Sequence, residues 1–141
     1  MSELLELHGV VEAPPDQVAK ILLDVRPGGR SPIAARGEVA DTDPGDDFVV
    51  VRDGSRLTVR IDHAARSVSQ QGEWWYRGVT SVEPDPRGSR VVHRVFNVAQ
   101  GHGWAVRFVA RGPLNRAPTA FAELVHGLGE LLGVAAWVVD E

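Results

Sequence analysis

The chain has 141 residues, 43% of them hydrophobic, which is the size and balance of one globular domain, so we expect a single domain over residues 1–141. It contains no cysteine, which excludes disulfide bonds, thiolate metal sites and a cysteine nucleophile. Its net charge is −4 with arginines scattered among acidic residues, which argues against nucleic acid or an anionic membrane surface as a partner.

The first residues carry no targeting pattern. Residues 1–6 lack the basic start and apolar core of a secretory signal. No apolar run approaches the roughly 20 residues that span a bilayer. We therefore expect a cytoplasmic protein without membrane insertion.

A strand and a short helix are predicted at the start of the chain. Apolar residues alternate with polar ones from Leu5 to Val11, the period of a half-buried strand, and His8 falls on the outer side. Prolines at 14 and 15 end this strand. Residues 16–24 then show helical spacing, with four inward side chains: Val18, Ile21, Leu22 and Val25.

Residues 26–47 are rich in glycine and proline and show no regular period, except for a possible short strand over 37–40. We interpret this segment as a mobile flap.

A β-hairpin is predicted next. Residues 48–52 and 56–63 read as strands joined by Asp53-Gly54, a dipeptide typical of two-residue hairpin turns. In the second strand His63 shares the phase of Val59 and Ile61, so we expect its imidazole to point inward.

The rest of the predicted sheet comes from residues 68–72, which lead into 73–77 and on to Val82, and from a returning strand over 89–99. The phase of the first places Trp74, Tyr76, Gly78 and Thr80 inside, and Trp75 and Arg77 outside. In the second, the inward set is Val91, His93, Val95 and Asn97. Phe96 and Val98 make the opposite face apolar too, so a bulge could reverse this phase.

The C-terminal part is predicted to be helical. Residues 103–110 fit either a helical turn or an edge strand, ended by Gly112-Pro113. A long amphipathic helix then runs from Pro118 to about Val139. Trp137, on its polar side, could be an exposed anchor for a partner chain or could lie under the 26–47 flap, and we expect contact within the domain. Glycines at 127, 129 and 133 should each cost about 1 kcal/mol in a helix. We expect a neighbouring segment to pass close to them, or space to be left for a ligand.

Two local patterns resemble the polyketide-cyclase and START-related (SRPBCC) superfamily. They are the strand-to-helix turn over 11–18 and the hairpin formed by 78–84 and 88–91. The resemblance implies an α+β helix-grip fold, in which a curved antiparallel sheet wraps around a long C-terminal helix and leaves an internal hydrophobic cavity. Members bind lipids, hormones or polyketides, and some are enzymes. The chain departs from the family at Ala19, where many relatives carry a bulky aromatic residue, and over 26–47, where they usually have a small helix.

No known catalytic motif is present, including the Gly-x-Ser-x-Gly elbow, the His-Glu-x-x-His zinc helix and glycine-rich phosphate or dinucleotide loops. The candidate catalytic residues are His63, His93 and Tyr76. Either histidine could remove an acidic proton while the phenol steadies an enolate oxygen, as in aldol-type cyclisation or dehydration. The candidate ligand-binding residues are Trp74, Asn97, Phe121, Leu124 and Leu128. Each of these side chains could instead be ordinary core.

Two functional hypotheses follow. The first is binding of a hydrophobic small molecule of polyketide, lipid or aromatic type, with or without catalysis, by a monomer or homodimer that uses no metal and no cofactor. The alternative is a non-catalytic protein-interaction module with a filled core. A cavity larger than on the order of 300 Å³ would favour the first hypothesis.

Overall fold

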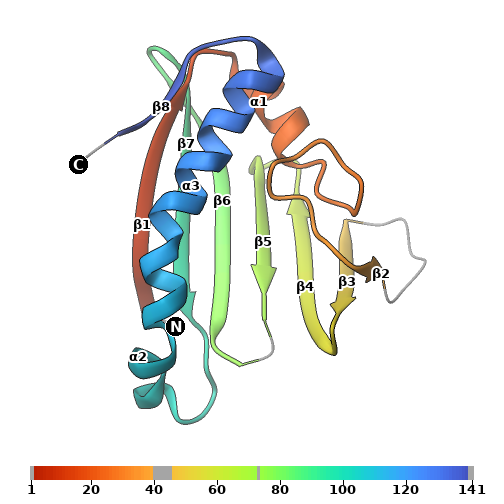
Figure 1. Ribbon diagram of the computed structural model, residues 1–141. Helices are drawn as coiled ribbons and strands as arrows, with labels where there is room; N and C mark the ends of the chain where they lie inside the picture. Colours follow the sequence, from red (N-terminus) through yellow and green to blue (C-terminus); the bar gives the residue numbers. More distant parts are fainter. Residues whose placement is uncertain (1, 40–45, 73, 140–141) are drawn as a thin grey trace.

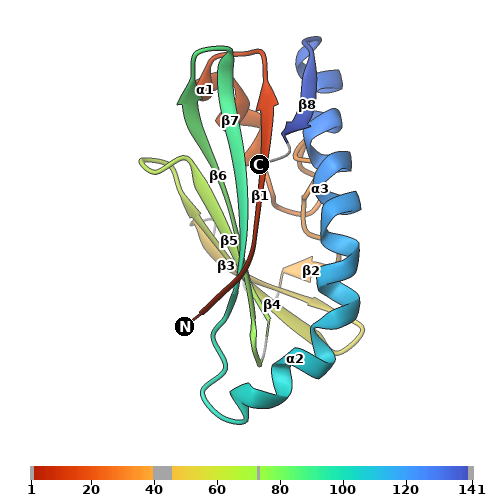
Figure 2. The same ribbon diagram turned by 90° about the vertical axis from the view of Figure 1, so that its left-hand side faces the viewer.

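The structure, a computed structural model, describes residues 2–39, 46–72 and 74–139. One eight-stranded antiparallel sheet, in the order β2-β3-β4-β5-β6-β7-β1-β8, curves around the long helix α3 (Figures 1 and 2). This is the predicted α+β helix-grip arrangement. The elements in chain order are β1 (Ser2–Val11), α1 (Pro15–Leu22), β2 (Glu38–Val39), β3 (Asp47–Arg52), β4 (Ser55–Asp62), β5 (Ser67–Gln71), β6 (Tyr76–Asp85), β7 (Gly88–Asn97), η1 (Gly103–Ala105), α2 (Val106–Val109), α3 (Arg111–Leu132) and β8 (Ala136–Val139).

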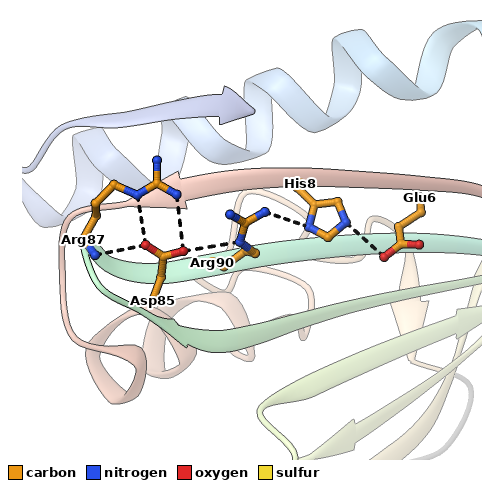
Figure 3. A network of polar contacts seen from close by, with 5 residues as sticks. All are labelled: Glu6, His8, Asp85, Arg87 and Arg90. Atoms are coloured by element: carbon orange, nitrogen blue, oxygen red, sulfur yellow. Dashed lines mark hydrogen bonds and ion pairs between the residues drawn. The ribbon is translucent and has the colours of Figure 1, made fainter. Parts of the chain in front are cut away.

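The alternation predicted for β1 is confirmed. Leu7 and Val11 pack in the main core, whereas His8 faces outward and lies in a polar network along β1 and β7 (Figure 3).

The Arg90 guanidinium lies 3.2 Å from His8 Nδ1 and can only donate, so Nδ1 accepts and the Nε2–H donates to Glu6 at 3.0 Å. At the other end of the network, hydrogen bonds from Arg87 hold the pKa of Asp85 down to about 2.

The predicted hairpin is also confirmed. Asp53 and Gly54 both have positive φ, at 51° and 80°, as a type I′ turn requires. β3 and β4 pair from Asp47↔Arg60 to Arg52↔Ser55.

The described part of the predicted flap is packed against the domain. The Arg26 guanidinium lies 4.5 Å from the centroid of the Phe48 ring, and the Ala35 N–H donates to the Val25 carbonyl at 2.8 Å. The possible strand over 37–40 is found as the two-residue β2, which pairs with β3. Residues 40–45 of the predicted flap lie outside the described residues.

The bounds predicted for the C-terminal helix are wrong at both ends. α3 begins at Arg111, so Gly112-Pro113 falls in its first turn, where a missing proline N–H removes no intrahelical bond, and Pro118 lies inside the helix. It ends at Leu132 because Gly133 takes the left-handed conformation, with φ 69°. Residues 136–139 form a strand, β8, that pairs with β1.

The helix glycines are explained by segments that pass close to them. A Cβ on Gly129 would lie 2.8 Å from the Ala136 Cβ, and one on Gly127 would lie 3.1 Å from the Pro32 Cγ. The expected contact of Trp137 within the domain is confirmed, although Trp137 lies on β8: the Arg87 guanidinium is 5.9 Å from its ring centroid.

The helical alternative for residues 103–110 is confirmed by η1 and α2. Val106 of α2 and Ala110, which follows it, pack with Trp75 and Val95 in a second, smaller hydrophobic cluster.

Candidate functional site

A cavity of about 340 Å³ lies between the sheet and the first half of α3. Its sheet wall carries polar groups, and its helix wall is mainly apolar. The sheet side includes Gln70, Tyr76, Thr80, His93 and Val95, and the helix side includes Leu114, Arg116, Ala117, Phe121 and Leu124.

The register of β6 and β7 brings the polar groups together. Thr80 pairs directly with His93, and Thr80 Oγ1 lies 2.8 Å from His93 Nδ1. Directly paired residues share a face of the sheet, so both side chains point toward α3. The His93 ring stacks on Phe121 of α3, with centroids 6.2 Å apart and planes at 25°. Helix and sheet therefore both fix the orientation of the imidazole.

Burial determines the charge state of His93. Desolvation lowers its pKa to about 4, so the imidazole is neutral near pH 7. A neutral imidazole has one donor and one acceptor nitrogen, and the Nδ1 side already faces a hydroxyl. A ligand would therefore form its hydrogen bond with Nε2.

Tyr76 is the second polar group of the wall. Burial raises the pKa of its phenol, which keeps the hydroxyl protonated and able to donate. Its ring packs edge-on against Trp75, with centroids 5.5 Å apart. Gly78 leaves room for this ring: a Cβ there would lie 2.5 Å from the Tyr76 hydroxyl and 3.3 Å from His93 Cε1.

Gly78 is one of the site residues that sequence reasoning missed, as is Thr80. Its inward phase was predicted, but its role was not. The available signal was a glycine in the inward phase of a strand between Tyr76 and Thr80, because such a glycine often marks the close approach of another group.

The cavity adjoins a larger, more open groove of about 860 Å³. Three residues, Ile33, Gln70 and Tyr76, line both spaces. The groove runs between the 33–36 loop and the end of the β3–β4 hairpin, and Trp74 and Trp75 border it. An elongated ligand could therefore extend from the cavity toward solvent.

The predicted inward position of His63 is wrong. β4 ends at Asp62, whose carboxylate accepts a hydrogen bond from the Ala65 N–H and so stabilises a turn. His63 lies in this turn with 66% of its side chain exposed, and its Nε2 is 3.1 Å from Asp46 Oδ1. The strand alternation holds as far as Ile61 and then stops, which leaves His63 outside the cavity.

The phase predicted for the two tryptophans is also wrong. β6 begins only at Tyr76, so its alternation does not extend upstream. Trp74 is 42% exposed and donates its indole N–H to the Gly101 carbonyl, whereas Trp75 is 9% exposed and packs inside.

Two other candidate ligand-binding residues lie away from the cavity. Asn97 borders a separate groove, and its Oδ1 accepts a hydrogen bond from the Ala99 N–H. Leu128 is fully buried in the main core. Of the predicted site residues, the structure thus brings together His93, Tyr76, Phe121 and Leu124.

Among the described residues, no three histidine, aspartate or glutamate side chains are grouped so that they could hold a metal ion. Over the same residues, no helix is both long and apolar enough to cross a membrane.

No protein-family model matches the chain, and no curated protein matches it. Solved structures do match. A protein from Nitrosospira multiformis aligns with a TM-score of 0.55 and 11% identity, covering 88% of this chain and 93% of the other. The Bacillus halodurans protein BH1534 aligns with a TM-score of 0.53 and 14% identity, covering 92% and 98%.

The crystal structure of Ara h 8.0201 aligns with a TM-score of 0.50 and 18% identity, again covering 92% of this chain and 98% of the other. Ara h 8 is a Bet v 1-like protein with the helix-grip fold. Identities this low establish shared architecture only. The chain therefore has a helix-grip fold of the Bet v 1 type.

Proposed function

We propose that this protein is a member of the SRPBCC superfamily that binds an apolar small molecule, of polyketide, lipid or aromatic type, between the sheet and α3. The observation that carries the proposal is the cavity of about 340 Å³, which falls within the range of roughly 300 to 1,000 Å³ typical of ligand sites. A filled core, as a pure interaction module would have, fits this observation poorly.

The distribution of polar groups supports a mainly apolar ligand with one polar end. Phe121 and Leu124 offer an apolar wall, while Tyr76 and His93 offer neutral hydrogen-bonding groups on the opposite side. A few polar groups in an apolar site fix a ligand's orientation, and neutral groups do so without the cost of burying a charge.

Binding is favoured over catalysis by the environment of His93. A general base works best with a pKa near the operating pH, whereas burial lowers the pKa of this imidazole to about 4. Its hydrogen-bond partner is the Thr80 hydroxyl, which cannot raise the basicity of the ring as a carboxylate would. Cyclisation or dehydration of the ligand is the second candidate, supported by the protonated Tyr76 phenol beside His93, which could donate to an enolate oxygen.

Titration with a neutral apolar fluorescent probe, N-phenyl-1-naphthylamine, tests the binding proposal. Ala117 lines the cavity, so Ala117→Trp should fill it and weaken probe binding by about tenfold or more. Thr119→Trp introduces the same side chain at an exposed position on the same helix and should bind the probe as the wild type does. Equal affinity of all three proteins, or no saturable binding by the wild type, would count against a cavity ligand.

A further inference from the structure

Exposed apolar side chains gather at one end of the molecule. Of the six large hydrophobic residues exposed in the described chain, five lie there: Leu4 (37%), Trp74 (42%), Trp104 (70%), Phe108 (54%) and Val109 (49%). Leu4 and Trp104 line the same groove, and the indole of Trp74 is hydrogen-bonded to the 101 carbonyl, just before η1. We call these five residues the aromatic tip. Both ribbon views place η1 and α2 at this end, beyond the ends of β6 and β7 (Figures 1 and 2).

The charge around the aromatic tip differs from that of the whole chain. The protein has 19 acidic residues and a net charge of −4, yet no aspartate or glutamate occurs from residue 86 to residue 122. Arg111 and Arg116 are exposed in the first turns of α3, and neither has an acidic partner within the described chain. The part of the tip on η1 and α2 is thus apolar, aromatic and locally cationic, and the acidic residue beside Leu4, Glu3, is ion-paired with Arg94.

We propose that the aromatic tip docks on an anionic lipid bilayer. Tryptophan and phenylalanine partition into the interface between headgroups and acyl chains, and arginines beside them pair with lipid phosphates. A projecting tip can enter a bilayer without the matching partner surface that a protein complex needs. The whole-chain charge argues against an anionic membrane, but the acidic residues responsible for it lie outside this segment of the sequence.

The position of the cavity makes such docking useful. Leu114, in the first turns of α3, lines both the groove at the tip and the cavity between the sheet and the helix. An apolar ligand dissolved in the bilayer would have a short path into the cavity. The docking proposal rests only on the exposed apolar residues and arginines of the tip, and it does not require that a ligand enters the cavity.

Co-sedimentation with vesicles tests the proposal, using phosphatidylcholine alone and phosphatidylcholine mixed with phosphatidylglycerol. The wild type should bind the mixed vesicles, and salt should weaken the binding. Trp104→Ser and Phe108→Ser should each lower the partition coefficient about tenfold. The matched control is Leu131→Ser, which removes the one large exposed hydrophobic outside the tip among the described residues and should bind as the wild type does.

A second pair of variants tests how much the arginine charge contributes to vesicle binding. Arg111→Gln should weaken binding to the mixed vesicles about fivefold and leave the low binding to phosphatidylcholine unchanged. Arg60→Gln removes an exposed arginine on β4 and should have no effect. The proposal is overturned if the wild type does not bind mixed vesicles or if the tip variants bind like the Leu131→Ser control. It is equally overturned if sedimentation velocity without lipid shows a dimer that Trp104→Ser dissociates, because the tip then covers a second copy of the chain.

Discussion

At the scale of single residues, the site is defined by two titratable groups that are held neutral. The His93 imidazole lies 2.8 Å from the Thr80 hydroxyl, stacks on the Phe121 ring and lies close to Gly78. Desolvation disfavours the charged form of an imidazole and of a phenolate alike, so it lowers the pKa of His93 and raises that of Tyr76. The polar wall of the cavity can therefore orient a ligand across the whole neutral range of pH without changing its charge.

The low pKa of His93 predicts a pH-dependent stability. Between about pH 6.5 and about pH 4 the imidazole is protonated in the unfolded chain but not in the folded protein, so stability falls as the pH falls through this window. At about 1.4 kcal/mol per pKa unit, the loss should approach 3 kcal/mol. In urea unfolding measured across this pH range, the unfolding free energy of His93→Gln should not show this part of the decline. His126→Gln, at an exposed position on α3, should keep it, and superimposable profiles for all three proteins would refute the burial of the His93 charge.

The fit of the Tyr76 ring over Gly78 predicts an energetic coupling. Gly78→Ala should cost about 1 to 3 kcal/mol of unfolding free energy, because the new Cβ would overlap the Tyr76 hydroxyl. In a Tyr76→Phe background the hydroxyl is absent, so the same substitution should cost less. A double-mutant cycle by urea denaturation measures the difference. Strictly additive costs would mean that the ring does not lie over Gly78.

At the scale of elements, the hydrophobic period predicted the strands that build the cavity wall. Gly78, Thr80, His93 and Val95 were expected to face inward, and the β6–β7 register confirms this. The failures occur where a strand stops. His63 and Trp74 lie one or two residues beyond strand ends, and a period of two carries no information about where pairing ends.

The C-terminal end shows the same difficulty in a helix. Ala135 and Val139 continue the spacing of four from Leu131, so periodicity alone extends the helix through Gly133. The termination depends on a left-handed glycine and on the exposed edge of β1, to which β8 adds. That edge is a tertiary feature, and no local pattern reports it.

We predict that alanine substitution changes stability in opposite directions at two glycines of α3. In Gly129→Ala the new Cβ would meet the Ala136 Cβ at 2.8 Å and the Val134 carbonyl at 2.9 Å. The steric cost should outweigh the gain in helix propensity and lower the unfolding free energy by about 1 to 2 kcal/mol in total. In Gly127→Ala the nearest atom is the Pro32 Cγ at 3.1 Å, in a loop that can yield. Stability there should be unchanged or rise by up to about 1 kcal/mol. Thermal unfolding compares the two variants, and equal shifts would contradict the close packing of β8 on α3.

At the scale of the whole molecule, α3 has two different roles along its length. Val125 and Leu128, toward its C-terminal end, are fully buried in the main core with β1 and α1, whereas Ala117 and Phe121, nearer its start, line the cavity. The later part of the helix thus supports the fold and the first part lines the cavity, with Phe121 contributing to both. This division explains how a small domain can hold a ligand site without losing its core.

Intermolecular NOEs between a bound apolar probe and the protein test the central claim most directly, because they report where the ligand lies. With methyl-labelled protein and N-phenyl-1-naphthylamine, we predict contacts from the probe to Leu124, Val95 and the ring protons of Phe121 and His93. These contacts should disappear in Ala117→Trp and persist in Thr119→Trp. NOEs confined to Trp104, Phe108 and Val109, or contacts unchanged by Ala117→Trp, would contradict binding between the sheet and α3.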